Sequence, residues 1–297
     1  MTHEFGNIDA WTSDKLARVE AYLNAYLTAL KNQNFRLEYI DAFAGTGFVN
    51  RSIQMPAQSL FDPEETVNLR DFIDGSARKA LQTTPPFDKY TFIEKHQKRS
   101  KELENLKADF PHLASSINII RGEANVNIQQ LCNANWIGER RRGVMFLDPY
   151  GTQVTWESIE AIAATKAIDL WILLPIGTVN RLLNRNGNII EARKKRLTTM
   201  FGEDEWFNRL YHKTEGESLF SNEPLIKLTK VNDPFGVIIA YFIERLSKVF
   251  AEVASNPLVM KNSTNSPIFL LCFAAGNPKG APIAVRIAKH ILGKGEL

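Results

Sequence analysis

The feature that most constrains the fold is a short connection near the end of the chain. Two apolar runs, residues 258–260 and 268–273, have the length and composition of β-strands. Only residues 261–267 join them. A connection this short cannot contain the crossover helix that parallel neighbours require. The sequence therefore predicts that the chain ends its sheet with an antiparallel β-hairpin.

Five earlier runs also have the character of buried strands. They are residues 37–43, 90–93, 117–120, 143–147 and 168–174. Helical patterns precede, separate or follow them, most clearly over 13–30, 126–137, 156–164, 237–249 and 281–292. Strands alternating with helices indicate a doubly wound α/β fold with a mostly parallel sheet. Five such units closed by a hairpin are the layout of the seven-stranded, Rossmann-like class I methyltransferase sheet.

Length and composition are those of an ordinary globular chain. The 297 residues, 44% of them hydrophobic, fit one domain over residues 1–297 with insertions at 48–74 and 181–220. The net charge of +3 does not by itself indicate nucleic-acid binding. Two distant cysteines predict reduced thiols, a cytoplasmic protein and no metal site. No apolar run is long enough to cross a membrane.

The first strand leads directly into a turn with two glycines. Asp41 lies at the end of this run, where a buried carboxylate requires partners. Gly45 and Gly47 follow, and a glycine turn after a strand exposes backbone N–H groups to a nucleotide-like ligand. The third glycine of the dinucleotide fingerprint is missing. An ordinary strand and turn with a tolerated aspartate is the alternative interpretation.

Polar residues also follow the second and third strands. Glu94 ends the second strand, where doubly wound folds hold a ribose through its two hydroxyls. Glu123 and Asn125 follow the third strand, and they could contact the edge of a purine ring. The alternatives are a surface carboxylate at Glu94 and a glycine turn with a helix cap after the third strand.

The fourth strand ends in Asp-Pro-Tyr-Gly, residues 148–151. In an open parallel sheet, this is the mouth of the ligand crevice. Asp148 could accept a proton from an attacking nitrogen, and Tyr150 could stack on a planar substrate or on the cofactor. The alternative is a turn in which Asp148 caps the helix beginning near Thr155.

Several cations have two interpretations. Lys15 and Arg18 are expected near the start of the first helix as solvated charges, although Lys15 could reach an anionic ligand group. The cluster at 140–142 is expected to be a solvated rim. Asn180 and Arg181 follow the fifth strand and could face the crevice as substrate-binding residues. The basic part of the second insertion, residues 181–196, is interpreted as a solvated helix face, or as a lid for an anionic substrate.

Taken together, these motifs resemble the three-Cys-motif partner proteins (TcmP). The resemblance rests on residues 41–47 (DAFAGTG), 92–95 (FIEK), 122–125 (GEAN), 146–151 (FLDPYG), 155–177 and Arg181. It implies a class I methyltransferase fold, S-adenosylmethionine as cofactor and a three-Cys-motif protein of the phage Gp37/Gp68 type as partner. The cofactor-binding residues that it implies are Asp41, Phe43, Gly45, Gly47, Glu94, Lys95, Glu123, Ala124, Asn125 and Asp148, with Asp148 and Tyr150 at the site of methyl transfer.

Three functions follow from this reading. The first is an S-adenosylmethionine-dependent methyltransferase of unknown substrate that acts with the three-Cys partner. The second is a cofactor-binding or non-catalytic scaffold subunit. The third is a methyltransferase that modifies nucleic-acid bases or ends, although enzymes that methylate the amino groups of nucleobases carry Asp-Pro-Pro-Tyr, and this chain has one proline fewer.

Overall fold

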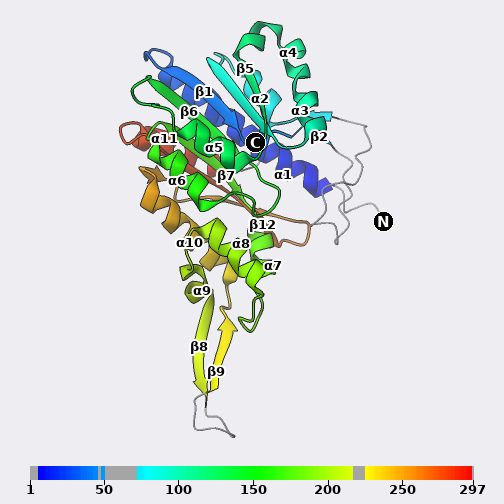
Figure 1. Ribbon diagram of the computed structural model, residues 1–297, viewed down its shortest axis with the longest axis vertical. Coiled ribbons are helices and arrows are strands. Elements are labelled where there is room, and N and C mark those ends of the chain that lie inside the picture. Colours follow the sequence, from blue (N-terminus) through cyan, green and yellow to red (C-terminus); the bar gives the residue numbers. More distant parts are fainter. Residues whose placement is uncertain (1–5, 46–47, 51–71, 217–224, 296–297) are drawn as a thin grey trace.

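The computed structural model describes residues 6–45, 48–50, 72–216 and 225–295. At its centre is an eight-stranded sheet with the order β10-β12-β7-β6-β1-β4-β5, and β11 also pairs with β12 (Figure 1). Its strands are β1 (Arg36–Asp41), β4 (Lys89–Glu94), β5 (Ile117–Arg121), β6 (Arg141–Leu147), β7 (Ile168–Leu174), β10 (Glu252–Val253), β11 (Leu258–Lys261) and β12 (Pro267–Ala275).

The strand directions confirm the predicted topology. Strands β5, β4, β1, β6 and β7 are parallel, and β12 runs antiparallel to both β7 and β11. The edge position beside β12 is shared by two short strands, because β10 pairs with residues 274–275 and β11 with residues 267–271. The sheet therefore has eight strands where seven were expected. Its order is that of the class I methyltransferase fold.

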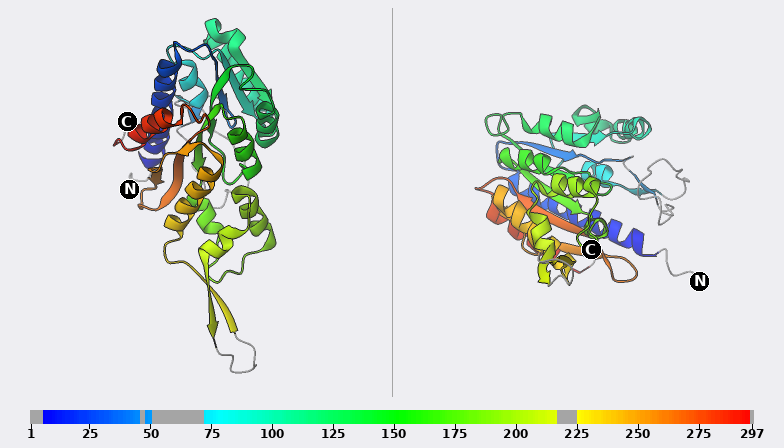
Figure 2. Two further views of the ribbon diagram at one scale, coloured as in Figure 1. Left: turned by 90° about the vertical axis from the view of Figure 1, so that its left-hand side faces the viewer. Right: turned by 60° about the horizontal axis from the view of Figure 1, so that its bottom comes forward.

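Helices cover both faces of the sheet (Figure 2). One face packs against α1 (Gly6–Leu30), α2 (Ser76–Leu81), α3 (Gln97–Leu103), α4 (Asn105–Asp109) and α11 (Ala281–Leu292), with a short 3-10 helix at Pro111–Ser116. The other packs against α5 (Ala124–Cys132), α6 (Trp156–Ala164) and α10 (Pro234–Val249). Strand β7 is buried on both faces, which explains why its residues are apolar except for Asp169. No helix in the described ranges is long and apolar enough to cross a membrane.

Helix α1 corrects the expectation for two cations. It begins at Gly6, so Lys15 and Arg18 lie well inside it rather than near its start. Both are buried, with exposed fractions of 4% and 1%. Arg18 donates to the carbonyl oxygens of Ile291 at 2.5 Å and Gly295 at 2.8 Å, and so ties α1 to the end of α11. Neither residue is a solvated charge.

The insertions contain more structure than the sequence predicted. In the first, β2 (Phe48–Asn50) pairs with β3 (Phe72–Asp74), and residues 51–71 lie outside the described ranges. The second begins after β7 with α7 (Ile176–Leu182), α8 (Glu191–Phe201) and α9 (Glu205–Leu210). It continues through an antiparallel pair, β8 (Tyr211–Gly216) and β9 (Leu225–Lys230). The β8–β9 pair extends to Lys230, past the boundary at residue 220 that we predict for this insertion. Helix α5 ends at Cys132, so it is shorter than the predicted 126–137.

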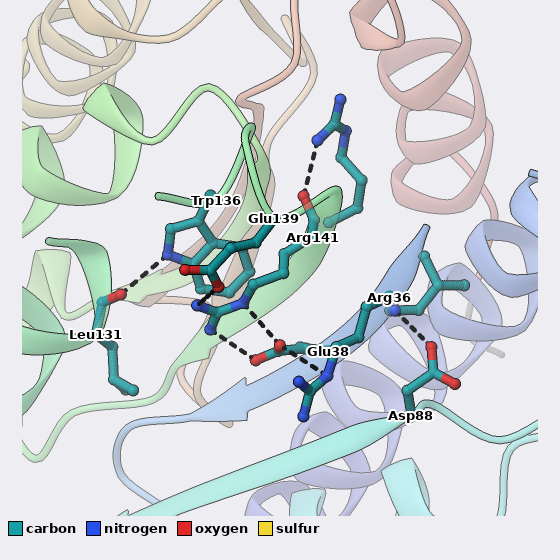
Figure 3. Close-up of polar contacts among 9 residues, drawn as sticks. Arg36, Glu38, Asp88, Leu131, Trp136, Glu139 and Arg141 are labelled. Carbon is teal, nitrogen blue, oxygen red and sulfur yellow. Dashed lines mark hydrogen bonds and ion pairs between the residues drawn. The ribbon is translucent and has the colours of Figure 1, made fainter. Parts of the chain in front are cut away.

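The amino ends of β1 and β6 carry a buried ion pair that the sequence analysis missed (Figure 3). Arg141 donates from Nε and a terminal nitrogen to the two carboxylate oxygens of Glu38, at 2.8 and 3.0 Å. Its guanidinium also lies 4.0 Å from the ring centroid of Trp136. The expectation of a solvated rim at 140–142 is therefore wrong for Arg141. The two strands are neighbours, so the pair joins them at the edge opposite the carboxyl ends.

This pair predicts a large effect on stability. Replacing Glu38 with Ala leaves a buried guanidinium without its carboxylate, which is expected to lower the free energy of unfolding by about 3 kcal/mol. Replacing exposed Glu139, which contacts the same Arg141 at 3.2 Å, is the matched control and is expected to cost less than about 1 kcal/mol. Urea denaturation of both variants measures the difference. Equal losses would contradict this assignment.

Candidate functional site

Three carboxylates stand at the carboxyl edge of the sheet on neighbouring strands. Asp41 is the last residue of β1, Glu94 is the last of β4, and Asp148 directly follows β6. Strand β1 lies between β4 and β6 and runs parallel to both. The three residues consequently meet at one edge, which is where ligands bind in open α/β sheets.

Asp41 is fully buried and held by two donors. Its carboxylate accepts from the backbone N–H of Phe43 at 3.1 Å and from the hydroxyl of Ser76 at 2.5 Å. Burial raises the pKa of Asp41 to about 7; the two hydrogen bonds oppose the shift, nearby Asp148 adds to it, and Lys15 lowers it. A titrating carboxyl group near neutral pH is a feature of functional sites, although structural networks produce it too.

Lys15 of α1 forms an ion pair with Asp148. The lysine side chain is 6% exposed, whereas that of Asp148 is 27% exposed. Helix α1 thus contributes a buried cation to the centre of the site, from a position far away in the sequence. One interpretation of Lys15 from the sequence is that it reaches an anionic group of a ligand. In the structure, the anionic group that it contacts is the carboxylate of Asp148.

The turn after β1 follows the edge of the sheet. The backbone N–H of Ala42 donates to the carbonyl of Phe146 at 3.2 Å, and that of Ala44 donates to Ile93 at 3.1 Å. Gly45 has a φ of +62°, which favours glycine. A Cβ placed there would meet no atom of the described chain within 4 Å, so the turn is open on that side. Gly47 lies outside the described residues.

The predicted ribose and adenine residues lie along the next strands. One oxygen of Glu94 accepts from the backbone N–H of His96 at 2.7 Å, and within the described ranges the other oxygen has no hydrogen-bond partner. Exposed Lys95 and Glu123 form an ion pair at 2.6 Å. Ala124 begins α5. The side chain of Asn125 is half-buried and forms hydrogen bonds to other residues of the chain.

Asn125 joins α5 to the loop that precedes α6. Its Nδ2 donates to the carbonyl of Gln153 at 2.9 Å, while its Oδ1 accepts from the N–H of Thr155 and the hydroxyl of Ser158. Thr155 caps α6 by accepting from the Ser158 N–H. The alternative in which Asp148 caps this helix is therefore wrong, and the amide of Asn125 has a structural role.

The Asp148–Gly151 turn is surrounded by cations. Tyr150 as a residue is 65% exposed, and the guanidinium of Arg99 from α3 lies 5.6 Å from the centroid of its ring. The next side chain, Thr152, accepts from Nε of Arg196 at 2.5 Å. Lys15, Arg99 and Arg196 thus approach the turn from α1, α3 and α8.

Asn180 and Arg181 differ from each other in their surroundings. Asn180 accepts from Nζ of Lys230 through Oδ1 at 2.6 Å and through its backbone carbonyl at 3.1 Å. Its side chain thus anchors the base of the β8–β9 hairpin. Arg181 is exposed and bonds only Thr178 of its own helix, at 3.0 Å, in the described part of the chain.

Two residues of the site, Ser76 and Arg99, were not expected from the sequence, and Arg196 was expected only as part of a solvated helix face or a basic lid. Ser76 begins α2 just after Gly75, Arg99 lies one turn into the helix after Glu94, and Arg196 is part of the basic segment. Helical spacing places Arg99 near the strand end, which is a usable signal. The contacts of Ser76 and Arg196 are long-range, and nothing local in the sequence indicates them.

The comparisons with known proteins leave the family open. No family model matches the chain, and no curated protein matches it. A Legionella pneumophila protein, LPL1258, of the DUF519 family is similar over 98% of this chain and 92% of its own, with 13% identity and a TM-score of 0.49. The CcbJ methyltransferase of Streptomyces caelestis covers 87% of this chain and 95% of its own, with 10% identity and a TM-score of 0.38. An rRNA methylase of Streptococcus thermophilus covers 72% and 95%, with 12% identity and a TM-score of 0.31.

These similarities concern the fold alone. The strand order and directions define the class of protein: a chain with the class I methyltransferase fold. Its carboxyl edge carries acidic residues on three adjacent strands and an open glycine turn.

Proposed function

We propose that this protein is an S-adenosylmethionine-dependent methyltransferase. The observation that carries the proposal is the position of Asp41, Glu94 and Asp148 at the ends of three adjacent parallel strands, around the open turn at Gly45. Asp41 and Asp148 lie close together. A positive charge beside them lowers the free-energy cost of ionising both carboxyl groups, so the site favours a cationic ligand. The sulfonium cofactor is such a ligand, and it supplies a methyl group that is already activated.

Each residue has a proposed task. Glu94 accepts hydrogen bonds from the ribose hydroxyls with the oxygen that has no partner among the described residues. Asp41, Phe43 and Gly45 line the methionine part, while Lys95, Glu123 and Ala124 lie toward the adenine. Asp148 orients the attacking group and accepts its proton, and Lys15 keeps that carboxylate in place. Positioning and exclusion of water supply most of the rate.

The proposed partner comes from the family resemblance. We propose that a neighbouring three-Cys-motif protein of the Gp37/Gp68 type joins this chain, and that it carries or presents the acceptor. The test is transfer of a labelled methyl group in an extract that contains the co-purified partner. Label in a product, lost in the Asp148→Asn variant, is expected. Cofactor binding without transfer to any acceptor would favour a scaffold subunit instead.

A further inference from the structure

The second insertion carries a group of cations that form no ion pair with a carboxylate of the described residues. Within the described ranges, none of these side chains has an ion-pair partner: Arg181, Arg185, Arg193, Lys194, Lys195, Arg196, Lys213, Lys227 and Lys230. We call this set the basic face.

Three acidic residues that follow α8 in the same insertion have partners of their own. Glu203 pairs with Arg245 at 2.9 Å, Glu205 with Arg209 at 3.7 Å, and Asp204 accepts from the hydroxyl of Thr198. Glu203 and Glu205 are thus paired outside the basic face, and its nine cations outnumber the remaining carboxylates of residues 181–230, so the basic face keeps a net positive charge. Charges left unpaired in a group create an attractive field for a polyanion.

One end of the basic face touches the candidate site. Arg196 donates to Thr152, and one of its terminal nitrogens lies 3.6 Å from the position that a Cβ on Gly151 would take. Arg193 precedes it by three residues on α8, so the two side chains lie on the same side of that helix. The cations of α8 thus lead to the turn that holds Asp148 and Tyr150.

The other end is an arm that leaves the body of the protein. The β8–β9 hairpin extends away from the sheet and its covering helices (Figure 1; Figure 2, left). In its register, Lys213 lies opposite Leu228, and Lys227 lies opposite Thr214, so each face of the ribbon presents a lysine. A two-stranded ribbon is marginally stable alone, but it is narrow enough to enter a nucleic-acid groove.

The base of the arm is fixed to the rest of the insertion. Nζ of Lys230 donates to the carbonyl oxygens of Asn180 and Leu183 at the end of α7, and the Tyr211 hydroxyl donates to the carbonyl of Asn184 at 2.7 Å. A Cβ on Gly187 would lie 2.9 Å from the side chain of Leu228, so the loop before α8 packs closely on the arm. These contacts therefore fix the position of the base of the arm relative to α7 and to the loop before α8.

We propose that the basic face binds the phosphate backbone of a nucleic acid and directs it toward the Asp148–Gly151 turn. Protein interfaces are depleted in lysine and contain an apolar centre. Here the cations predominate, and among the insertion residues whose side-chain burial is described, Ile190 is the only large apolar residue that is strongly exposed, at 60%. Nucleic-acid interfaces carry much more positive charge than protein–protein interfaces do, and the basic face is positive in the same way. That the bound strand is a methyl acceptor rests on the proposed function; binding itself does not.

The test measures anisotropy of labelled single-stranded RNA, single-stranded DNA and duplex DNA across a series of salt concentrations. The Arg193→Glu/Lys195→Glu variant is expected to bind at least tenfold more weakly, with a salt dependence reduced by about two phosphate contacts. A second variant, Lys213→Glu/Lys227→Glu, tests the arm. The matched control is Lys279→Glu/Arg286→Glu, which reverses two exposed charges near α11 and is expected to change binding less than twofold. The nucleic acid bound most tightly identifies the source of the phosphates.

Calorimetry with S-adenosylmethionine on the same variants separates the two proposals. Unchanged cofactor binding with weakened nucleic-acid binding supports the inference. Nucleic-acid binding without any heat of binding for S-adenosylmethionine would overturn the proposed function, but it would still support the inference that the basic face binds nucleic acid. Equal losses in the control, or no salt-dependent binding to any of the three nucleic acids, would overturn the inference; in the latter case an acidic protein partner becomes the better candidate for this surface.

Discussion

The Asp41→Asn variant is expected to be more stable than the unaltered protein at pH 8 and to bind S-adenosylmethionine more weakly. The pKa of Asp41 is raised from 3.8 to about 7 in the folded state. Between these values the folded protein holds a proton that the unfolded chain releases, so the contribution of Asp41 to stability falls as the pH rises from about 4 to 7. Asparagine removes this penalty and can still accept from the Phe43 N–H.

The expected gain is about 2 to 4 kcal/mol at pH 8 and less than about 1 kcal/mol at pH 4. Thermal denaturation at several pH values measures it. Cofactor affinity is expected to fall, because the variant lacks the charge that a cationic ligand favours. In the unaltered protein, the same affinity is expected to weaken as the pH falls below about 7.

A second buried aspartate provides the control. Burial raises the pKa of Asp169 to about 6, and its carboxylate accepts from the Tyr22 hydroxyl at 2.7 Å and the Gly276 N–H at 3.0 Å. It lies near the amino end of β7, away from the site. Asp169→Asn is expected to raise stability at pH 8 by a smaller amount and to leave cofactor affinity unchanged. Equal affinities in both variants would show that Asp41 takes no part in binding.

The Lys15–Asp148 pair predicts the second large effect. Replacing Lys15 with Met leaves Asp148 beside Asp41 without the lysine cation, and is expected to lower the free energy of unfolding by about 3 kcal/mol. Asp148→Asn leaves a buried lysine and is expected to reduce methyl transfer about 100-fold or more. The double variant removes both charges, so its loss of stability is expected to be smaller than the sum of the single losses by about 1 to 2 kcal/mol.

A partly exposed ion pair between α1 and α2 is the matched control for this cycle. Lys79 of α2 and Glu20 of α1 lie 2.8 Å apart, with side chains 30% and 27% exposed. The corresponding Met and Gln variants are expected to change stability by less than about 1 kcal/mol. Chemical denaturation of all six variants gives both coupling energies. If the coupling energy between Lys15 and Asp148 is no larger than that of the control pair, the Lys15–Asp148 ion pair contributes no more to stability than a partly exposed one.

The order and direction of the strands were predictable because local patterns carry that information. The apolar run at 168–174 and the helices at 156–164 and 281–292 match the structure, since each has a clear period and a turn or cap at its ends. The short connection before residue 267 required an antiparallel pair, which the register confirms. The acidic strand ends followed from the same reasoning.

What the sequence could not show depends on partners that are distant along the chain. Lys15, Arg18 and Arg141 look like surface charges until tertiary packing brings Asp148, the end of α11 and Glu38 beside them. The β8–β9 arm was missed because its strands mix lysine, threonine and glutamate and do not alternate clearly between apolar and polar residues. Its pairing is a property of the folded insertion.

The most direct test of the central claim is isothermal titration of the unaltered protein with S-adenosylmethionine, with NAD and ATP as comparison ligands. The account predicts saturable binding of one equivalent of the sulfonium compound, weakened at least tenfold in Glu94→Gln, and no comparable heat from the other two. Absence of heat with S-adenosylmethionine, or tighter binding of NAD or ATP, would contradict it.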